Sequence, residues 1–318
     1  MNIYIKTTEQ CNLHCLHCYT PAVNKQIDFD RLDYFLSTIN TNENDFFILH
    51  GGEPLMGDIK KTISLVKKYN NVNWRITTNL TCELTEEKID LLKRMKQVRT
   101  SFDIKIRFKN IKNLLRWIRN IKKLSSMNID LWLNICLSDY VLQKDPIKIC
   151  DLCKKLKIKT LSFERITRSG RGEFANFIPS YSKIDDWLCS FFYEYKNYMQ
   201  YFRCAEFDNI VAGIVQNNKV YRGAECCKNT ITINADGTIG ECPDSANNKI
   251  LGTYNNDIYS ILNKKESCKI KNTCLACNLF TLCHGSCKAY WGLNECPYPK
   301  KLSKVIKNEY IPIIQMQS

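Results

Sequence analysis

The first two-thirds of the chain alternates between short apolar runs and segments whose apolar residues recur at helical spacing. The short runs predict strands at residues 2–6, 45–50, 73–78, 98–103, 129–137 and 160–164. The segments that follow them predict helices at residues 28–39, 59–69, 85–95, 110–124, 146–156 and 182–201. Repeated strand–helix units indicate a parallel sheet with right-handed crossovers. Six units are too few for a closed eight-stranded barrel, so we expect an α/β fold built as a partial (βα)6 TIM-like barrel.

The pattern changes after residue 202. Cysteines become dense from about Arg203 onward, and a hairpin is predicted at residues 230–241 with Ala235-Asp236-Gly237 as its turn. We therefore expect two domains, a partial barrel at residues 1–202 and a small cysteine-rich domain at residues 203–318. So many cysteines among few apolar runs indicate that metal organises the second domain.

Composition narrows the class of protein. The 318 residues are 44% hydrophobic and 25% charged, which is typical of a globular protein. No apolar run is long enough to cross a bilayer, and Met1–Gln10 has no apolar signal core, so we predict a cytoplasmic location without membrane contact. In such a chain, eighteen cysteines favour metal binding over disulfides.

The formal net charge is +14, and we attribute most of it to a chain that is rich in lysine throughout rather than to a nucleic-acid partner. Residues 105–123 stand out because they hold eight basic residues and no acidic one. Apolar residues at helical spacing make this segment an amphipathic helix: Ile111, Leu114, Leu115, Ile118 and Ile121. Its basic face is either simply solvated or a docking surface for an acidic electron donor.

Three cysteines follow the first predicted strand in the pattern C-x3-C-x2-C: Cys11, Cys15 and Cys18. Three close thiolates can hold a four-iron cluster and leave one iron open for a further ligand. His14 and His17 lie between them, so a zinc site is the alternative. The cluster is favoured by the position of the loop after a strand and by the next motif.

That motif, Gly51-Gly52-Glu53-Pro54, lies just past the second predicted strand, at the strand end where α/β folds bind ligands. Its glycines allow backbone to approach a ligand closely. Together the two motifs resemble the radical S-adenosylmethionine superfamily over about residues 1–200.

This resemblance implies a catalytic [4Fe–4S] cluster on Cys11, Cys15 and Cys18. It implies that S-adenosylmethionine chelates the fourth iron, and that the Gly51–Pro54 segment lies along its amino group. Polar residues at the next strand ends would then face cofactor or substrate: Thr78, Asn79, Ser101 and Asp103.

A second cysteine array has the pattern C-x9-G-x4-C … C-x2-C-x5-C-x3-C … C and resembles the SPASM domain. The resemblance implies two auxiliary [4Fe–4S] clusters, and so three clusters in all. The distal cluster would be held by Cys274, Cys277, Cys283 and Cys296. The proximal cluster would be held by Cys227, Cys242 and Cys287. Some relatives have a fourth proximal cysteine where this chain has Tyr221; Cys226 or Cys204 could replace it, or the site could be open to substrate.

The family chemistry implies reductive cleavage of S-adenosylmethionine to a 5′-deoxyadenosyl radical, which abstracts hydrogen from the substrate. Modification of a peptide or protein by crosslinking, epimerisation or oxidation is the first hypothesis. A small-molecule dehydrogenase, epimerase or decarboxylase acting on a sugar or nucleoside is the second. The intact Gly51–Pro54 loop argues against a mere electron carrier or a nucleic-acid-binding zinc protein.

Three further expectations concern partners and activity. A flavodoxin or ferredoxin would deliver the electron. Because the chain begins at the first strand, a leader peptide would need a separate recognition protein. Sulfatase maturases have a similar layout, but in them Asp directly follows the second hairpin cysteine, whereas Pro243 stands here and Asp244 comes next.

Overall fold

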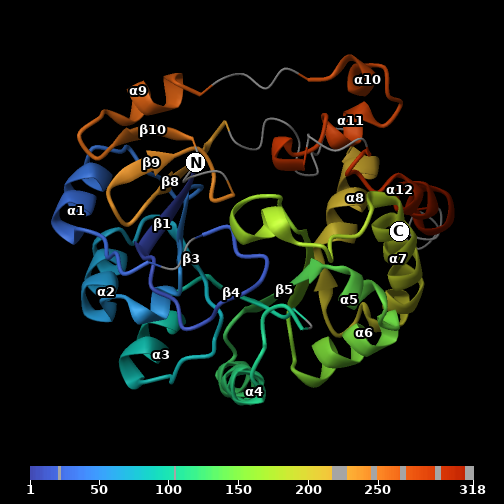
Figure 1. Ribbon diagram of the computed structural model, residues 1–318, viewed down its shortest axis with the longest axis horizontal. Helices are drawn as coiled ribbons and strands as arrows, with labels where there is room; N and C mark the ends of the chain where they lie inside the picture. Colours follow the sequence, from blue (N-terminus) through green and yellow to red (C-terminus); the bar gives the residue numbers. More distant parts are fainter. Residues whose placement is uncertain are drawn as a thin grey trace. The chain divides into compact units, whose positions relative to one another are not determined.

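The computed structural model of the chain describes residues 1–20, 23–103, 105–216, 228–244, 249–265, 270–290 and 295–311 (Figure 1). Its contacts divide the chain into two compact units. Unit 1 comprises Met1–Trp132, Thr167–Phe174 and Cys227–Glu266, and unit 2 comprises Leu133–Ile166, Ala175–Cys226 and Ser267–Ser318. The predicted domain boundary after residue 202 stays a prediction.

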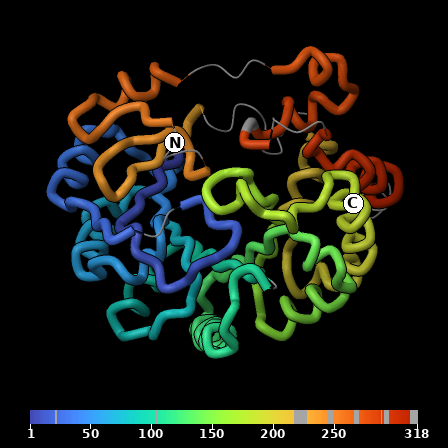
Figure 2. The backbone as a smooth tube through the Cα atoms, viewed as in Figure 1, coloured from blue at the N-terminus to red at the C-terminus, as the bar shows by residue number. Residues whose placement is uncertain are grey.

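Unit 1 is built on a sheet whose strands follow the order β10-β9-β8-β1-β2-β3-β4. Strands β1 to β4 are parallel, and β8 joins them in parallel beside β1. Figure 2 shows this meeting of distant segments, with β1 in blue beside β8 in orange. The strands are β1 (Asn2–Thr8), β2 (Phe46–Gly51), β3 (Asn73–Thr77), β4 (Gln97–Ser101), β8 (Thr230–Ile233), β9 (Thr238–Gly240) and β10 (Ile250–Thr253).

The helices of unit 1 mostly connect consecutive strands. Their N-termini are capped by polar side chains, as when Asp28 accepts hydrogen bonds from two backbone N–H groups of α1. The helices are α1 (Phe29–Ser37), α2 (Ile59–Lys68), α3 (Glu86–Lys93), α4 (Ile111–Ser126) and α9 (Ile258–Asn263), with 3-10 turns η1 (Pro54–Met56) and η2 (Gly170–Phe174).

The two faces of this sheet differ in exposure. One face is sealed by side chains that are at most 3% exposed: Ile3, Ile5, Phe47, Leu49, Trp74, Ile76 and Val98. Helices cover it, since Phe47 packs against Tyr69 at the end of α2, and Trp117 of α4 donates a hydrogen bond to Thr100. Alternate residues point to the opposite face and keep partial exposure. We call this the accessible face; its members include Tyr4, Phe46, His50, Arg75, Thr77 and Arg99.

Unit 2 has its own parallel strand pair, β6 with β7, and a helical layer. The first two residues of strand β5 (Leu131–Leu137) belong to unit 1, and the others belong to unit 2. Asp185 on α7 (Tyr181–Tyr195) accepts hydrogen bonds from the backbone N–H groups of Lys301 and Leu302, which fastens α12 (Lys300–Val305) to α7. The other strands are β6 (Thr160–Arg165) and β7 (Arg203–Cys204).

The helices of unit 2 are mostly short, and two are long. The long ones are α7 (Tyr181–Tyr195) and α8 (Ala205–Gln216). The others are α5 (Asp139–Leu142), α6 (Pro146–Lys155), α10 (Asn272–Leu275), α11 (Phe280–Cys283) and α12 (Lys300–Val305), with turns η3 (Lys196–Tyr198), η4 (Lys288–Tyr290) and η5 (Ile306–Tyr310).

The predicted α/β class with a parallel sheet and a terminal hairpin is confirmed, and each predicted strand overlaps an observed one. The buried face of α4 differs from the prediction. The helix buries Trp117, Asn120, Ile121 and Leu124, whereas Ile111 is 64% exposed and Leu115 is 55% exposed. Helix α8 and strand β7 were not predicted. Among the described residues, no helix is long and apolar enough to cross a membrane.

Candidate active site

The cysteine loop, residues 11–18, leaves the carboxyl end of β1. Cys15 is buried, and Cys11 and Cys18 are half-buried. Burial and, to a smaller extent, the nearby charges of Glu53, Cys15 and Cys18 raise the pKa of Cys11 to about 11, although the hydrogen bond from the Leu13 N–H opposes the shift. Without metal, the Cys11 thiol therefore keeps its proton at neutral pH, and binding a cluster has to release it.

Gly51 and Gly52 bring the end of β2 against the backbone that leads into this loop. Gly51 has φ +132°, and a Cβ atom there would lie 2.2 Å from the carbonyl oxygen of Thr8. A Cβ atom on Gly52 would lie 2.2 Å from the carbonyl oxygen of Gln10. The N–H of Gly52 donates to Thr8 O at 2.9 Å, and that of Glu53 to Gln10 O at 2.7 Å. Only glycine fits this close approach, which ties the segment to the residue before Cys11.

Glu53 joins the ends of β2 and β3. Its carboxylate is fully buried and accepts hydrogen bonds from the Thr78 hydroxyl at 2.6 Å, the Asn79 N–H at 2.6 Å and the Leu55 N–H at 3.0 Å. Burial raises the pKa of this carboxyl, and the three hydrogen bonds act in the opposite direction. Pro54 is the first residue of η1 and is buried beside it.

Asn79 connects this carboxylate to the cysteine loop. Its Nδ2 donates to Asn12 Oδ1 at 2.8 Å and lies 3.7 Å from the Cys11 sulfur. Its Oδ1 accepts from the N–H and the hydroxyl of Thr81 at 2.8 and 2.6 Å. Asn12 in turn donates to the Thr81 hydroxyl at 3.0 Å. The side chains of Asn79, Asn12 and Thr81 thus form one closed amide network beside Cys11.

Helix α4 supports the same network from outside. Asn120 donates to the carbonyl oxygens of Leu80 and Cys82 at 2.9 and 2.8 Å, and Arg116 donates to that of Thr81 at 3.3 Å. Asn120 is one of the buried residues of α4 because these two carbonyls satisfy its amide. Sequence reasoning did not identify Asn12 or Asn120, since single polar residues in a loop or helix carry no recognisable spacing. It considered Arg116 only as one of the basic residues of the segment 105–123.

Asp103 lies on the other side of the loop and is fully buried. Arg107 Nε donates to its Oδ2 at 2.6 Å, and His17 Nε2 lies 3.7 Å from the same oxygen. Burial lowers the pKa of His17 to about 4, although the charge of Asp103 opposes the shift. The N–H of Leu16 donates to Ile106 O at 3.0 Å, so the segment after β4 also holds the loop.

The structure thus brings most of the predicted strand-end residues to the cysteine loop. Gly51, Gly52, Glu53, Thr78 and Asn79 belong to one connected framework with Cys11, and Asp103 lies beside His17. Ser101 is the last residue of β4 and is half-buried. These positions agree with the predicted arrangement, while the contacts with cofactor stay predictions.

In unit 2, four of the C-terminal cysteines gather. Burial raises the pKa of Cys283, and the charges of Cys296, Cys277 and Cys274 act in the same direction, which indicates that each of these three cysteines lies near Cys283. These are the four residues predicted for the distal cluster.

The cysteines predicted for the proximal cluster are described only in part. Cys287 is buried in unit 2, and Cys242 is half-buried in unit 1. Cys204 is fully buried in β7. Cys226 and Cys227 lie outside the described residues, so the ligand set of this cluster stays a prediction.

The backbone between Cys283 and Cys287 is unusual. His284, Gly285 and Ser286 have φ values of 44°, 78° and 61°, in the left-handed region. This region is disfavoured for residues other than glycine, so two of the three positions are strained. Such strain persists where other interactions hold the segment.

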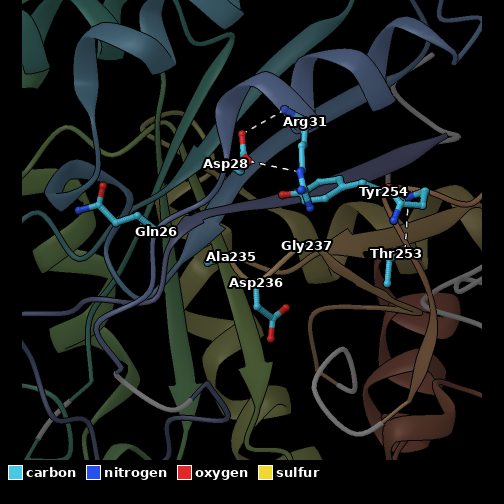
Figure 3. A pocket seen from close by; sticks show the side chains of 9 residues that line it. Gln26, Asp28, Arg31, Ala235, Asp236, Gly237, Thr253 and Tyr254 are labelled. Atoms are coloured by element: carbon cyan, nitrogen blue, oxygen red, sulfur yellow. Dashed lines mark hydrogen bonds and ion pairs between the residues drawn. The ribbon is translucent and has the colours of Figure 1, made fainter.

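A hollow of about 230 Å³ lies at the start of α1. Figure 3 shows the side chains that line it. Asp28 caps α1 in its wall, and Asp236 pairs with Lys25 at 3.2 Å. Gly237 has φ +84°, and a Cβ atom there would lie 2.4 Å from the Tyr254 ring. Because both carboxylates already have partners, we interpret the hollow as the polar joint between α1 and the β8–β9 turn.

The fold and the site define a class: an α/β enzyme whose parallel strands end at a three-cysteine loop buttressed by a Gly-Gly-Glu segment. Residues 5–153 match the model of the radical SAM superfamily. The chain therefore carries a radical SAM domain in residues 5–153.

Two curated relatives match parts of the chain. An uncharacterized protein of Archaeoglobus fulgidus is 34% identical over 93 residues, which are 28% of this chain and 22% of that protein. An uncharacterized protein of Methanocaldococcus jannaschii is 30% identical over 129 residues, which are 38% of this chain and 43% of that protein. The chain thus matches less than half the length of these relatives.

Solved structures share the fold over nearly the whole chain. The structure of anSMEcpe with bound AdoMet and the Cp18Cys peptide has a TM-score of 0.81 and 18% identity, and covers 99% of this chain and 98% of that one. The structure of Streptococcus suis SuiB bound to the precursor peptide SuiA has a TM-score of 0.67 and 16% identity, and covers 91% of this chain and 72% of that one.

Proposed function

We propose that this chain is a cytoplasmic radical SAM/SPASM maturase that cleaves S-adenosylmethionine reductively and abstracts hydrogen from a peptide or protein substrate. The observation that carries the proposal is the framework that joins Cys11 to Asn79, Asn79 to Glu53 and Glu53 to the end of β3. This framework fixes a thiol donor at the carboxyl ends of parallel strands, where α/β enzymes bind their ligands.

The donor set at this loop fits a four-iron cluster with one open iron. Cys11, Cys15 and Cys18 supply three thiols within eight residues, and His17 is engaged with Asp103. Cysteine thiolates are the usual ligands of such clusters. When bound, the cluster supplies one electron that breaks a carbon–sulfur bond of S-adenosylmethionine and so yields a 5′-deoxyadenosyl radical.

The chain's own residues would then position and shield the cofactor. Backbone of Gly51 and Gly52 would lie along the amino group of S-adenosylmethionine, and Glu53 would orient this segment through its three buried hydrogen bonds. Asn79 would hold Cys11, and Asp103 would fix the side chain of His17. Ser101 and Thr78 would line the same strand ends.

We further propose two auxiliary four-iron clusters. The gathered thiols of Cys274, Cys277, Cys283 and Cys296 support the distal one. Cys227, Cys242 and Cys287 would hold the proximal one, with Cys226, Cys204 or the substrate at the fourth iron. These clusters would accept electrons from the oxidised product or bind it.

A peptide substrate is supported by two structural relatives, anSMEcpe and SuiB, which were solved with the Cp18Cys peptide and with the precursor peptide SuiA. An acidic flavodoxin or ferredoxin would deliver the electron, and a separate protein would recognise a leader peptide.

The test is production of 5′-deoxyadenosine by the anaerobically reconstituted, dithionite-reduced protein, measured by chromatography. The wild type should form it, and the Cys11→Ala, Cys15→Ala and Cys18→Ala variants should not. Cys189→Ala, a half-buried cysteine on α7, is the matched control and should match the wild type. Absence of 5′-deoxyadenosine from wild-type protein with a complete iron content would refute the proposal.

A further inference from the structure

The accessible face of the sheet in unit 1 carries two arginines on neighbouring strands. Arg75 of β3 pairs in register with Gln97 of β4, and Thr77 pairs with Arg99. Arg75 and Arg99 therefore point to the same face, one on each strand and two positions apart in register. Thr77, opposite Arg99, directly precedes Thr78, whose hydroxyl binds Glu53.

Each guanidinium stacks on an aromatic ring. The guanidinium carbon of Arg75 lies 3.7 Å from the centroid of the Phe46 ring, and that of Arg99 lies 4.3 Å from the centroid of the Trp132 ring. Stacking fixes the plane of a guanidinium, whose N–H donors lie along its edge.

Two donors in this cluster lack an acceptor. Arg75 Nε and Trp132 Nε1 are buried and have no hydrogen-bond partner among the described residues. Arg75 also has no ion pair within that part of the chain, whereas Arg99 Nε donates to Gln97 Oε1 at 2.7 Å. Buried donors are nearly always paired, so donors left open on an accessible face indicate a missing acceptor.

The electrostatics of the cluster also favour an anion. Burial and the positive charge of Arg99 together lower the pKa of Arg75 to about 10. Two cations held close together at a partly buried position repel each other, and a bound oxyanion would relieve this repulsion. Arginine edges match the planar or tetrahedral geometry of such groups.

We propose that Arg75, Arg99 and Trp132 bind an oxyanion group of the substrate, a carboxylate or a phosphate, on the accessible face of β3 and β4. The identification of this anion as part of the substrate rests on the proposed function; the binding site itself rests on the side chains just described. Anchored there, a substrate would extend toward the strand ends where Thr78 and Asn79 meet the cysteine loop.

The test is calorimetric titration of the full, cluster-loaded chain with three probes in a buffer without competing oxyanions. The probes are N-acetylaspartate amide for a carboxylate, inorganic phosphate, and the neutral N-acetylasparagine amide. Wild type should bind one or both anions and not the neutral probe. Tighter binding of the carboxylate would indicate an acidic substrate, and tighter binding of phosphate a phosphorylated one.

Arg75→Gln should weaken anion binding at least ~10-fold, because a charge-assisted hydrogen bond is lost. Trp132→Phe keeps the ring that stacks on Arg99 and removes the N–H, so it should weaken binding by a smaller factor. Arg31→Gln, at an exposed arginine of α1, is the control and should bind as the wild type does. Circular dichroism confirms that each variant is folded. If Arg75→Gln does not fold, Arg75→Lys, which keeps the charge, is titrated in its place.

Equal binding by Arg75→Gln and Arg31→Gln would overturn the inference, as would a wild type that binds neither anion or binds the neutral probe equally well. Failure of the proposed function would appear separately, as absence of 5′-deoxyadenosine from wild type. The titration does not depend on turnover, so the two results can be told apart.

Discussion

The cysteine loop at residues 11–18 and the cysteine array at residues 274–296 offer similar thiols on very different supports. The loop is held by side-chain hydrogen bonds from Asn79 and by backbone hydrogen bonds to the Gly51–Glu53 segment. The array lies on α10 and α11, which are four residues long and have no side-chain cap at their N-termini. It also contains the left-handed residues His284 and Ser286.

This difference shows where metal is needed for structure. Around the loop, the side chains of Glu53, Asn79 and Thr81 are hydrogen-bonded within one framework, so this framework exists before any cluster arrives. In the array, helices of four residues cannot stabilise themselves, and strained residues need an external constraint. We therefore expect the array to depend on its cluster for folding, as small metal-organised modules do.

Removal of iron should have the largest effect, and this effect should differ between the cysteine array and the cysteine loop. After anaerobic chelation, amide hydrogen exchange should become fast across residues 274–290, because the array loses the cluster that constrains its short helices. Residues 51–55 and 78–82 should keep their protection, since Glu53 and Asn120 still hold them. Mass spectrometry of peptic peptides measures both. Equal loss of protection in the two regions would contradict the comparison.

Cys283→Ala should remove one cluster and leave the others. Three four-iron clusters correspond to about twelve irons per chain, so this variant should retain about eight. Cys283 is the buried member of the gathered set, and Cys189→Ala is a control in the same unit. Iron analysis gives the count, and 5′-deoxyadenosine formation should persist because the loop at residues 11–18 is intact. An unchanged iron content would show that Cys283 is not a ligand.

Glu53→Gln tests the framework around the loop. The amide keeps the shape of the side chain, but its NH2 group has to replace one of the two carboxylate oxygens. In one orientation the NH2 group faces the Asn79 N–H, and in the other it faces the Thr78 hydroxyl and the Leu55 N–H. In both orientations a donor faces a donor. The free energy of unfolding should fall by about 2 kcal/mol, and 5′-deoxyadenosine formation should fall with it. Glu43→Gln, at an exposed site, should change neither. Denaturant titration measures the free energy of unfolding, and an unchanged value would show that the hydrogen bonds of Glu53 do not stabilise the framework.

Asn120→Ala should have a smaller effect, confined to the loop after β3. Loss of its hydrogen bonds to Leu80 O and Cys82 O should cost about 2 kcal/mol and loosen residues 79–82. Asn113→Ala on the same helix is the matched control. Hydrogen exchange in residues 79–82 should rise in Asn120→Ala alone, and a similar rise in both variants would assign the effect to the helix rather than to these bonds.

The sequence predicted the parts of this molecule that repeat or keep a fixed spacing. The strands of the sheet follow from alternating apolar runs, and the cysteine loop and Gly51–Glu53 segment follow from their motifs. The amide network of Asn12, Asn79 and Thr81, and its support by Asn120, could not be predicted, because these residues lie in separate parts of the chain and only the fold brings them together. Thr78 and Asn79 were predicted from their position at a strand end, without their bond to Glu53.

Helix α4 shows why a periodic pattern can predict a helix correctly and still predict the wrong buried face. Apolar residues line two neighbouring stripes of this helix, and spacing alone does not choose between them. The choice is made by Trp117, which donates to Thr100, and by Asn120, which binds two carbonyls. The stripe that includes Ile111 and Leu115 is left exposed beside basic residues.

This exposed stripe is the basis of the smallest predicted effect, on electron delivery. Lys112 and Arg119 are exposed on α4, so an acidic flavodoxin would dock there by charge. Lys112→Glu with Arg119→Glu should slow flavodoxin-dependent 5′-deoxyadenosine formation a few-fold at low salt and leave dithionite-dependent formation unchanged. Arg116 is unsuitable for this test because it donates to Thr81 O and its loss would disturb the cysteine loop. Lys61→Glu with Lys67→Glu, on α2, changes the net charge equally and should have no effect. An equal loss with both electron donors would place α4 among the supports of the loop rather than at a docking surface.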